Sequence, residues 1–118
     1  MTRHTDAARI ALLNDRFRSN VLTGNGVPGR TVITRGLAAL PMDVQLEAFT
    51  RVQCFATFTP DNDPWQEHDC GRFLLSTGDA VLWKIDYYAD AGCTFGAADP
   101  ADPAQVYRVL TVMLASEY

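Results

Sequence analysis

The fold class is decided by the stretch Ala80-Val-Leu-Trp-Lys-Ile-Asp-Tyr-Tyr88, whose alternating pattern is typical of a half-buried β-strand. The face expected to meet the core is formed by Val81, Trp83, Ile85 and Tyr87. The opposite face is formed by Leu82, Lys84, Asp86 and Tyr88. Thr77-Gly78-Asp79 comes directly before this stretch and is typical of a tight turn, so we expect residues 72–76 to pair with it in a hairpin.

Three further segments are predicted to be helical. Residues 5–18 carry an apolar stripe at helical spacing, and a second helix is expected from Pro41 until just before Thr59-Pro60. A third helix is predicted after Asp102, because Asp102, Pro103 and Gln105 resemble a capping box. The stripe expected on that helix consists of Val106, Val109, Leu110, Met113 and Leu114.

Short strands are expected at 31–34 and 93–95, and a loop at 59–71. Because the strands do not alternate with the helices in a βαβ rhythm, a doubly wound parallel sheet is not expected. We predict one α+β domain over residues 1–118, with an antiparallel sheet of three to four short strands and about three helices packed on it.

Composition excludes several classes of protein. The chain has 118 residues, of which 47% are hydrophobic and 20% charged, values that are ordinary for a globular protein and not for a disordered one. No apolar run is long enough to span a membrane, and the first residues do not resemble a secretion signal. Three cysteines without a Cys-x-x-Cys pair fit a reducing compartment, so we expect a cytoplasmic protein.

Negative charge is concentrated in the middle of the chain. The formal net charge is −4, and residues 59–103 hold nine acids against Arg72 and Lys84. Direct binding of nucleic acid or of a membrane is therefore not expected. The acidic segment could attract a basic protein surface or a cation, or it could simply be a solvated face.

Several motifs resemble a known family. They are Thr59-Pro-Asp-Asn-Asp-Pro-Trp-Gln-Glu-His-Asp69, Trp83-Lys-Ile-Asp-Tyr-Tyr88, Asp99-Pro-Ala-Asp-Pro103, Ile10–Phe17 and Gly36–Pro41. Together the motifs resemble a bacterial domain-of-unknown-function family, the one numbered 3768, found mainly in alphaproteobacteria. The resemblance implies a small uncharacterised bacterial protein, often carried on plasmids and other mobile elements. It supplies no catalytic residues.

The loop at 59–71 contains the chemically richest cluster, formed by Asp61, Asp63, Glu67, His68 and Asp69. Carboxylates with one histidine suit Mg²⁺, Mn²⁺ or Fe²⁺, so a divalent metal site is one interpretation. The other is structural, with Asx-turns and hydrogen bonds to the backbone. His68 could act as a general base, but no nucleophile stands in a recognisable motif, and we assign no catalytic residue.

The sheet could also offer a binding surface. Lys84, Asp86 and Tyr88 share the face expected to lie away from the core, where they would either bind a partner or form a local ion pair. Trp65 is expected to plug the sheet edge, or else to anchor a partner.

We therefore predict a protein-interaction or accessory module rather than an enzyme, without a cofactor. A variant of this prediction is a counter-defence factor of a mobile element. Its partner would be another protein or a second copy of itself, bound through the acidic loop and the adjoining sheet face. The alternative is a metal-dependent hydrolase-like enzyme that uses the Asp61–Asp69 cluster with a divalent metal.

Overall fold

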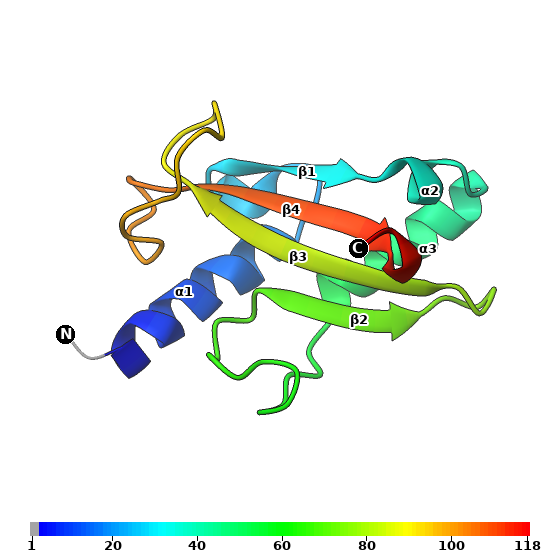
Figure 1. Ribbon diagram of the computed structural model, residues 1–118, viewed down its shortest axis with the longest axis horizontal. Coiled ribbons are helices and arrows are strands. Elements are labelled where there is room, and N and C mark those ends of the chain that lie inside the picture. The colour runs from blue at the N-terminus through cyan, green and yellow to red at the C-terminus, as the bar shows by residue number, and fades with distance from the viewer. Residues whose placement is uncertain (1–2) are drawn as a thin grey trace.

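The computed structural model describes residues 3–118, with side chains from residue 6 onward. The helices are α1 (Arg3–Arg18), α2 (Arg35–Ala38) and α3 (Met42–Cys54), and the strands are β1 (Gly29–Ile33), β2 (Cys70–Leu74), β3 (Ala80–Tyr88) and β4 (Tyr107–Leu114). Two short 3-10 turns are η1 (Gly24–Gly26) and η2 (Ala115–Glu117). Figure 1 shows the four strands side by side, with α1 and α3 behind them.

The α+β class is confirmed, but the sheet is mixed rather than purely antiparallel. The strand order is β1-β4-β3-β2, and β1 runs parallel to β4 while the other two pairs are antiparallel. The parallel pair arises because α3 carries the chain from the end of β1 to the start of β2, so that both strands run in the same direction. The β2–β3 hairpin then reverses the chain direction once, and the segment 89–106 reverses it again before β4 enters between β1 and β3.

The prediction of a C-terminal helix is wrong, because Tyr107–Leu114 forms β4 in the middle of the sheet. A central strand is buried on both faces and therefore reads as an almost continuous apolar run, which also satisfies helical spacing. The capping signature is used in a turn: the backbone N–H of Ala104 donates to Asp102 Oδ1 at 2.9 Å, and the Gln105 amide donates to Asp102 Oδ2 at 2.7 Å. No helix follows that turn.

The predicted hairpin is confirmed, and β3 has the predicted bounds. Its predicted partner strand is shifted by two residues and forms β2. The expected strand at 93–95 is a turn, with an isolated bridge between Tyr88 and Gly96. The second predicted helix ends at Cys54, where Phe55 adopts an extended conformation, and α2 was not predicted at all.

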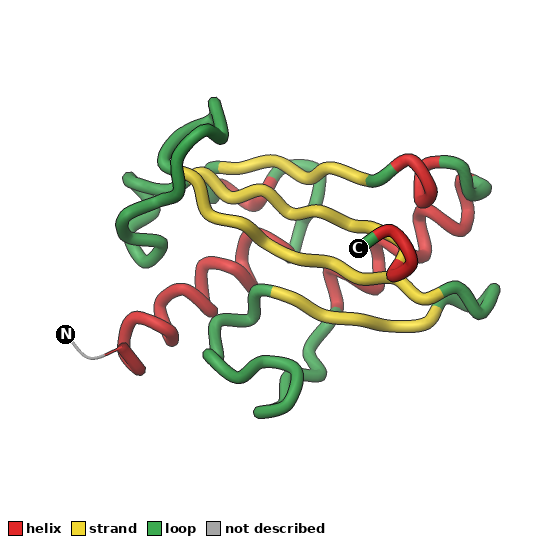
Figure 2. The backbone as a smooth tube through the Cα atoms, viewed as in Figure 1, coloured by secondary structure: helices red, strands yellow, loops and turns green. Residues whose placement is uncertain are grey.

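One face of the sheet carries the core. Val81, Trp83 and Ile85 are buried there as predicted, and Tyr87 is half-buried. α1 and α3 cover this face, so the helices and the sheet share one hydrophobic cluster that includes Phe17, Leu37, Ala48, Val52 and Leu110. Figure 2 shows both helices on that side, while the opposite side of the strands faces the viewer. We call this opposite side the outer face.

Candidate functional site

His68 connects the loop at 59–69 to α1. Its Nδ1 lies 2.9 Å from both carboxylate oxygens of Asp15, and its Nε2 lies 3.7 Å from Asp63 Oδ2. The imidazole also stacks on Phe58, with ring centroids 3.9 Å apart and planes inclined by 2°. His68 holds a positive φ of 56°, a conformation that must be stabilised by its surroundings. These contacts define His68 as an anchor of the loop.

Arg18 extends this network into the core. It is only 2% exposed, and its Nη1 donates to the carbonyl oxygens of Val52 at 2.6 Å and of Phe55 at 2.9 Å. Its Nη2 donates to Asp15 at 3.0 Å, and its guanidinium carbon lies 4.6 Å from the ring centroid of Trp83. Burial lowers the pKa of Arg18, while the Asp15 carboxylate opposes that shift. Arg18 thereby satisfies carbonyls at the end of α3.

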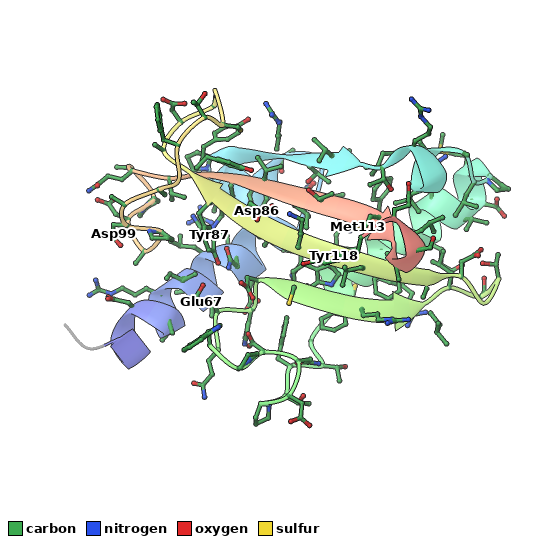
Figure 3. The ribbon with its side chains drawn as sticks, in the orientation of Figure 1. Glu67, Asp86, Tyr87, Asp99, Met113 and Tyr118 are labelled. Atoms are coloured by element: carbon green, nitrogen blue, oxygen red, sulfur yellow. The ribbon has the colours of Figure 1, made fainter. Side chains whose placement is uncertain are left out.

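Glu67 belongs to a second network. The Tyr87 hydroxyl donates to Glu67 Oε1 at 3.2 Å, and the Asn14 amide donates to the Tyr87 oxygen at 2.8 Å and to the Glu67 carbonyl at 2.9 Å. Arg108 donates to Asn14 Oδ1 at 2.6 Å and to the Pro100 carbonyl at 2.8 Å. Asn14 and Arg108 are completely buried, and burial raises the pKa of Tyr87. Figure 3 shows Glu67, Tyr87 and Asp99 at the same end of the sheet.

The structure disperses the five residues of the predicted metal cluster. Asp63 is buried and accepts the backbone N–H of His68 at 3.2 Å, while Asp61 is exposed. Asp69 is half-buried, and burial raises its pKa above the ordinary value. Among the side chains described, those of residues 6–118, no group of three or more His, Cys, Asp or Glu is placed to hold a metal ion. The hydrogen bonds instead follow the structural interpretation, in which the acids accept protein donors.

A groove of about 480 Å³ lies between α1 and the loop, lined in part by Leu12, Phe58, Thr59 and His68. General-base catalysis there would require an imidazole nitrogen directed at a nucleophile. Both nitrogens of His68 face carboxylates instead, and the Thr59 hydroxyl accepts from the Asn62 backbone N–H at 3.3 Å. The groove therefore contains no assembled base and nucleophile pair from these residues.

The outer face is the other predicted site. Lys84 and Asp86 form an ion pair of 2.5 Å there, and this hydrogen bond raises the pKa of Lys84. Tyr88 is half-buried on the same face. Trp65 is 62% exposed, which does not fit the expectation that it plugs the sheet edge. Figure 3 shows Asp86, Met113 and Tyr118 over the near side of the sheet.

The C-terminal segment adds residues to this face that the sequence analysis missed. The register places Tyr107, Val109, Thr111 and Met113 of β4 beside Tyr88, Asp86, Lys84 and Leu82 of β3. Val32 of β1 lies next to Thr111 and is 37% exposed. A helical prediction for 103–114 could not place these side chains on a sheet. Because Val109 and Met113 are buried as well as Leu110 and Val112, β4 lacks the alternation that would have placed them from the sequence.

These features define a small α+β protein with helices on one face of a mixed sheet and an outer face rich in apolar side chains. The chain belongs to the family described as "Protein of unknown function (DUF3768)", whose model matches residues 33–117. The segment 10–17, which resembles the family as well, lies outside that match. No curated protein and no solved structure matches the chain. None of the helices in the described part of the chain is long and apolar enough to cross a membrane.

Proposed function

We propose that this protein is a protein-interaction module that binds a partner through the outer face of its sheet. The single observation that carries the proposal is the composition of that face. The register aligns Val32, Leu82, Tyr88 and Tyr107 on it, all at least partly accessible, next to Val109 and Met113, which the chain itself buries. A solvated sheet face normally carries polar side chains, so a contiguous apolar set is typical of a contact surface.

The charged groups on the outer face fit this role. Lys84 and Asp86 neutralise each other, so the centre of the face presents little net charge to a partner. Interface centres are depleted in unpaired charge and enriched in aromatic residues, and this face presents Tyr88 and Tyr107, both partly accessible. The exposed acids Asp61, Asp90 and Asp99 lie on loops away from the strands and would steer a partner with a basic rim.

The setting we propose follows the family resemblance: the cytoplasm of a bacterium, where the protein would act as an accessory or counter-defence factor of a mobile element. The partner would then be a host or element-encoded protein with an apolar patch bordered by basic residues. Self-association through the same face would bury the same side chains, so the oligomeric state is measured first.

Photo-crosslinking tests the proposal. A benzoylphenylalanine placed at Thr111, in the middle of the outer face, should yield a discrete crosslinked species in a lysate of the native host. The matched control places the same group at Arg9, which is exposed on α1. Sedimentation of the purified protein at several concentrations distinguishes a foreign partner from a second copy.

Crosslinks that form equally from both positions would indicate random encounters and would overturn the proposal. The absence of any crosslinked species from Thr111, together with a monomer at every concentration, would do the same. A Leu82→Lys variant should remove the crosslink without unfolding the sheet, because Leu82 lies on the outer face and is only partly buried.

A further inference from the structure

A groove of about 540 Å³ runs along the free edge of β2, where Arg72 borders the outer face beside Leu82. Its lining residues include Arg51 of α3, Phe55 in the segment that follows α3, and Arg72, Phe73 and Leu74 of β2. Because β2 is the last strand of the sheet, one side of its backbone faces this groove and not another strand.

Backbone hydrogen bonds at the two ends of the β2–β3 ladder identify the backbone groups that face the groove. Asp69 accepts from the Ile85 N–H, and Leu75 donates to the Asp79 carbonyl, both at 2.8 Å. Alternate residues of an antiparallel strand point their N–H and C=O groups to opposite sides. Residues 71 and 73 therefore bond to β3, and Arg72 and Leu74 direct their backbone groups away from it.

Positive charge lies on both sides of this edge. Arg51 donates to the carbonyl oxygen of Leu74, and its guanidinium carbon lies 4.8 Å from the ring centroid of Phe73. Arg72 is exposed at the middle of the strand. Among the residues that the structure describes, no carboxylate forms an ion pair with either arginine. The groove is thus a basic site in a chain whose net charge is −4.

The floor and rim of the groove are apolar. Phe73 is 8% exposed and Leu74 is 59% exposed, so a bound chain would find both a packed ring and an accessible aliphatic side chain. Since Arg51 occupies the Leu74 carbonyl, the groups left for pairing are the N–H and C=O of Arg72 and the N–H of Leu74. A strand edge with free backbone groups and side-chain contacts on both sides is the geometry used in strand addition.

We propose that this groove binds an extended acidic segment of a partner protein, which pairs with the edge of β2 and places its carboxylates against Arg51 and Arg72. The charge complementarity selects this occupant: Arg72 is exposed and forms no ion pair with the side chains that the structure describes, and Arg51, whose charge also acts on Glu47, adds a second guanidinium, so the groove favours a chain rich in Asp or Glu. The inference goes beyond the proposed function, since it concerns the free backbone groups of β2; the N-methylated peptide described below distinguishes strand pairing from binding on the outer face, which Arg72 borders beside Leu82.

The test is an NMR titration of the full ¹⁵N-labelled chain with the acidic peptide acetyl-(Glu-Val)₃-amide. We expect saturable shifts centred on the amides of Arg72 and Leu74, with a Kd below about 1 mM. Two matched peptides probe the mechanism. Acetyl-(Lys-Val)₃-amide reverses the charge, and an acidic peptide N-methylated at alternate residues keeps the charge but loses strand pairing. Neither should bind measurably.

Variants locate the site. Arg72→Gln should weaken the acidic peptide about tenfold, the effect of losing one charge-assisted contact. Arg30→Gln is the matched control, because Arg30 is exposed on β1 at the opposite edge of the sheet, and it should leave the affinity unchanged. Leu74→Pro removes one outward N–H and should weaken binding about tenfold, whereas Leu74→Ala should have a smaller effect.

The proposal is overturned if no shift appears up to about 1 mM peptide. Equal binding of the lysine or N-methylated peptide, or equal loss from Arg30→Gln and Arg72→Gln, would also overturn it. Self-association that Leu74→Pro abolishes would assign the edge to a second copy of the chain instead. If Leu74→Pro fails to fold, the peptides and Arg72→Gln decide the question.

Discussion

The carboxylate of Glu117 accepts a hydrogen bond from the backbone N–H of Gly36 at 2.8 Å, although the two residues are 81 positions apart. The same carboxylate accepts from the Thr34 hydroxyl at 2.5 Å and from the Leu114 backbone N–H at 3.1 Å. It therefore joins the C-terminal turn η2 to the start of α2, where backbone N–H groups have no partner within the helix. The family match begins and ends close to this contact.

Gly36 and Glu117 should behave as one unit in a double-mutant cycle. A Cβ at Gly36 would lie 2.6 Å from Glu117 Cδ, so Gly36→Ala should displace the carboxylate. Gly36→Ala and Glu117→Ala should each lower the unfolding midpoint, and the double variant should lower it no further than the worse single one. Chemical denaturation measures all four proteins. Additive effects would mean that the contact does not form in solution.

Stability should fall in acid through two carboxylates. Hydrogen bonds from Ser76 lower the pKa of Glu47 below its ordinary value of 4.5, and hydrogen bonds from Thr34 and Gly36 do the same for Glu117. A carboxylate with a depressed pKa stabilises the fold above the unfolded value and loses that contribution as the pH falls through the folded value. Urea unfolding of wild type and Glu47→Gln should differ near neutral pH and converge below 4.5. A difference that does not change with pH would contradict this assignment.

Gly71 should not tolerate a side chain. An added Cβ would lie 2.5 Å from Trp83 Nε1 and 2.8 Å from two ring carbons of Phe55. Because both rings pack in the core, Gly71→Ala should cost about 1–3 kcal/mol, measured by chemical denaturation. The control is Gly96→Ala, where the nearest atom is 3.9 Å away and the change should stay within about 0.5 kcal/mol. Equal stability of the two variants would refute the close approach of Gly71 to Trp83.

Of the arginines in α1, Arg18 should contribute most to the free energy of unfolding. Arg18→Met removes the donor to the Val52 and Phe55 carbonyls and leaves them buried, so it should cost about 3 kcal/mol in the free energy of unfolding. Arg16→Gln is the matched control, since Arg16 is exposed and donates to Asn25 at the surface. It should cost less than about 1 kcal/mol. A mild effect of Arg18→Met would mean that water reaches those carbonyls.

The hairpin could be predicted from the sequence and the roles of the loop residues could not, and both outcomes have physical causes. The hairpin around Gly78 could be predicted because alternation and turn chemistry act over a few neighbouring residues. The Lys84–Asp86 ion pair was one of the two alternatives predicted for that face, since the two residues share one face of one strand. The roles of Asp63, Glu67 and His68 were open, because their partners Asp15, Asn14 and Tyr87 come from distant positions.

The amino-acid sequence by itself indicated a sheet with one apolar face, a helix over 5–18 and a second helix from Pro41, although this second helix ends at Cys54 and not just before Thr59. These are local consequences of period and composition. Only the tertiary structure decided that Tyr107–Leu114 is a strand, because β1 and β3 supply hydrogen bonds on both sides and make its apolar residues a two-faced core. The tertiary structure also placed the acidic loop against α1, where His68 contacts Asp15. A buried carboxylate needs a hydrogen-bond donor, and the fold determines which residue supplies it.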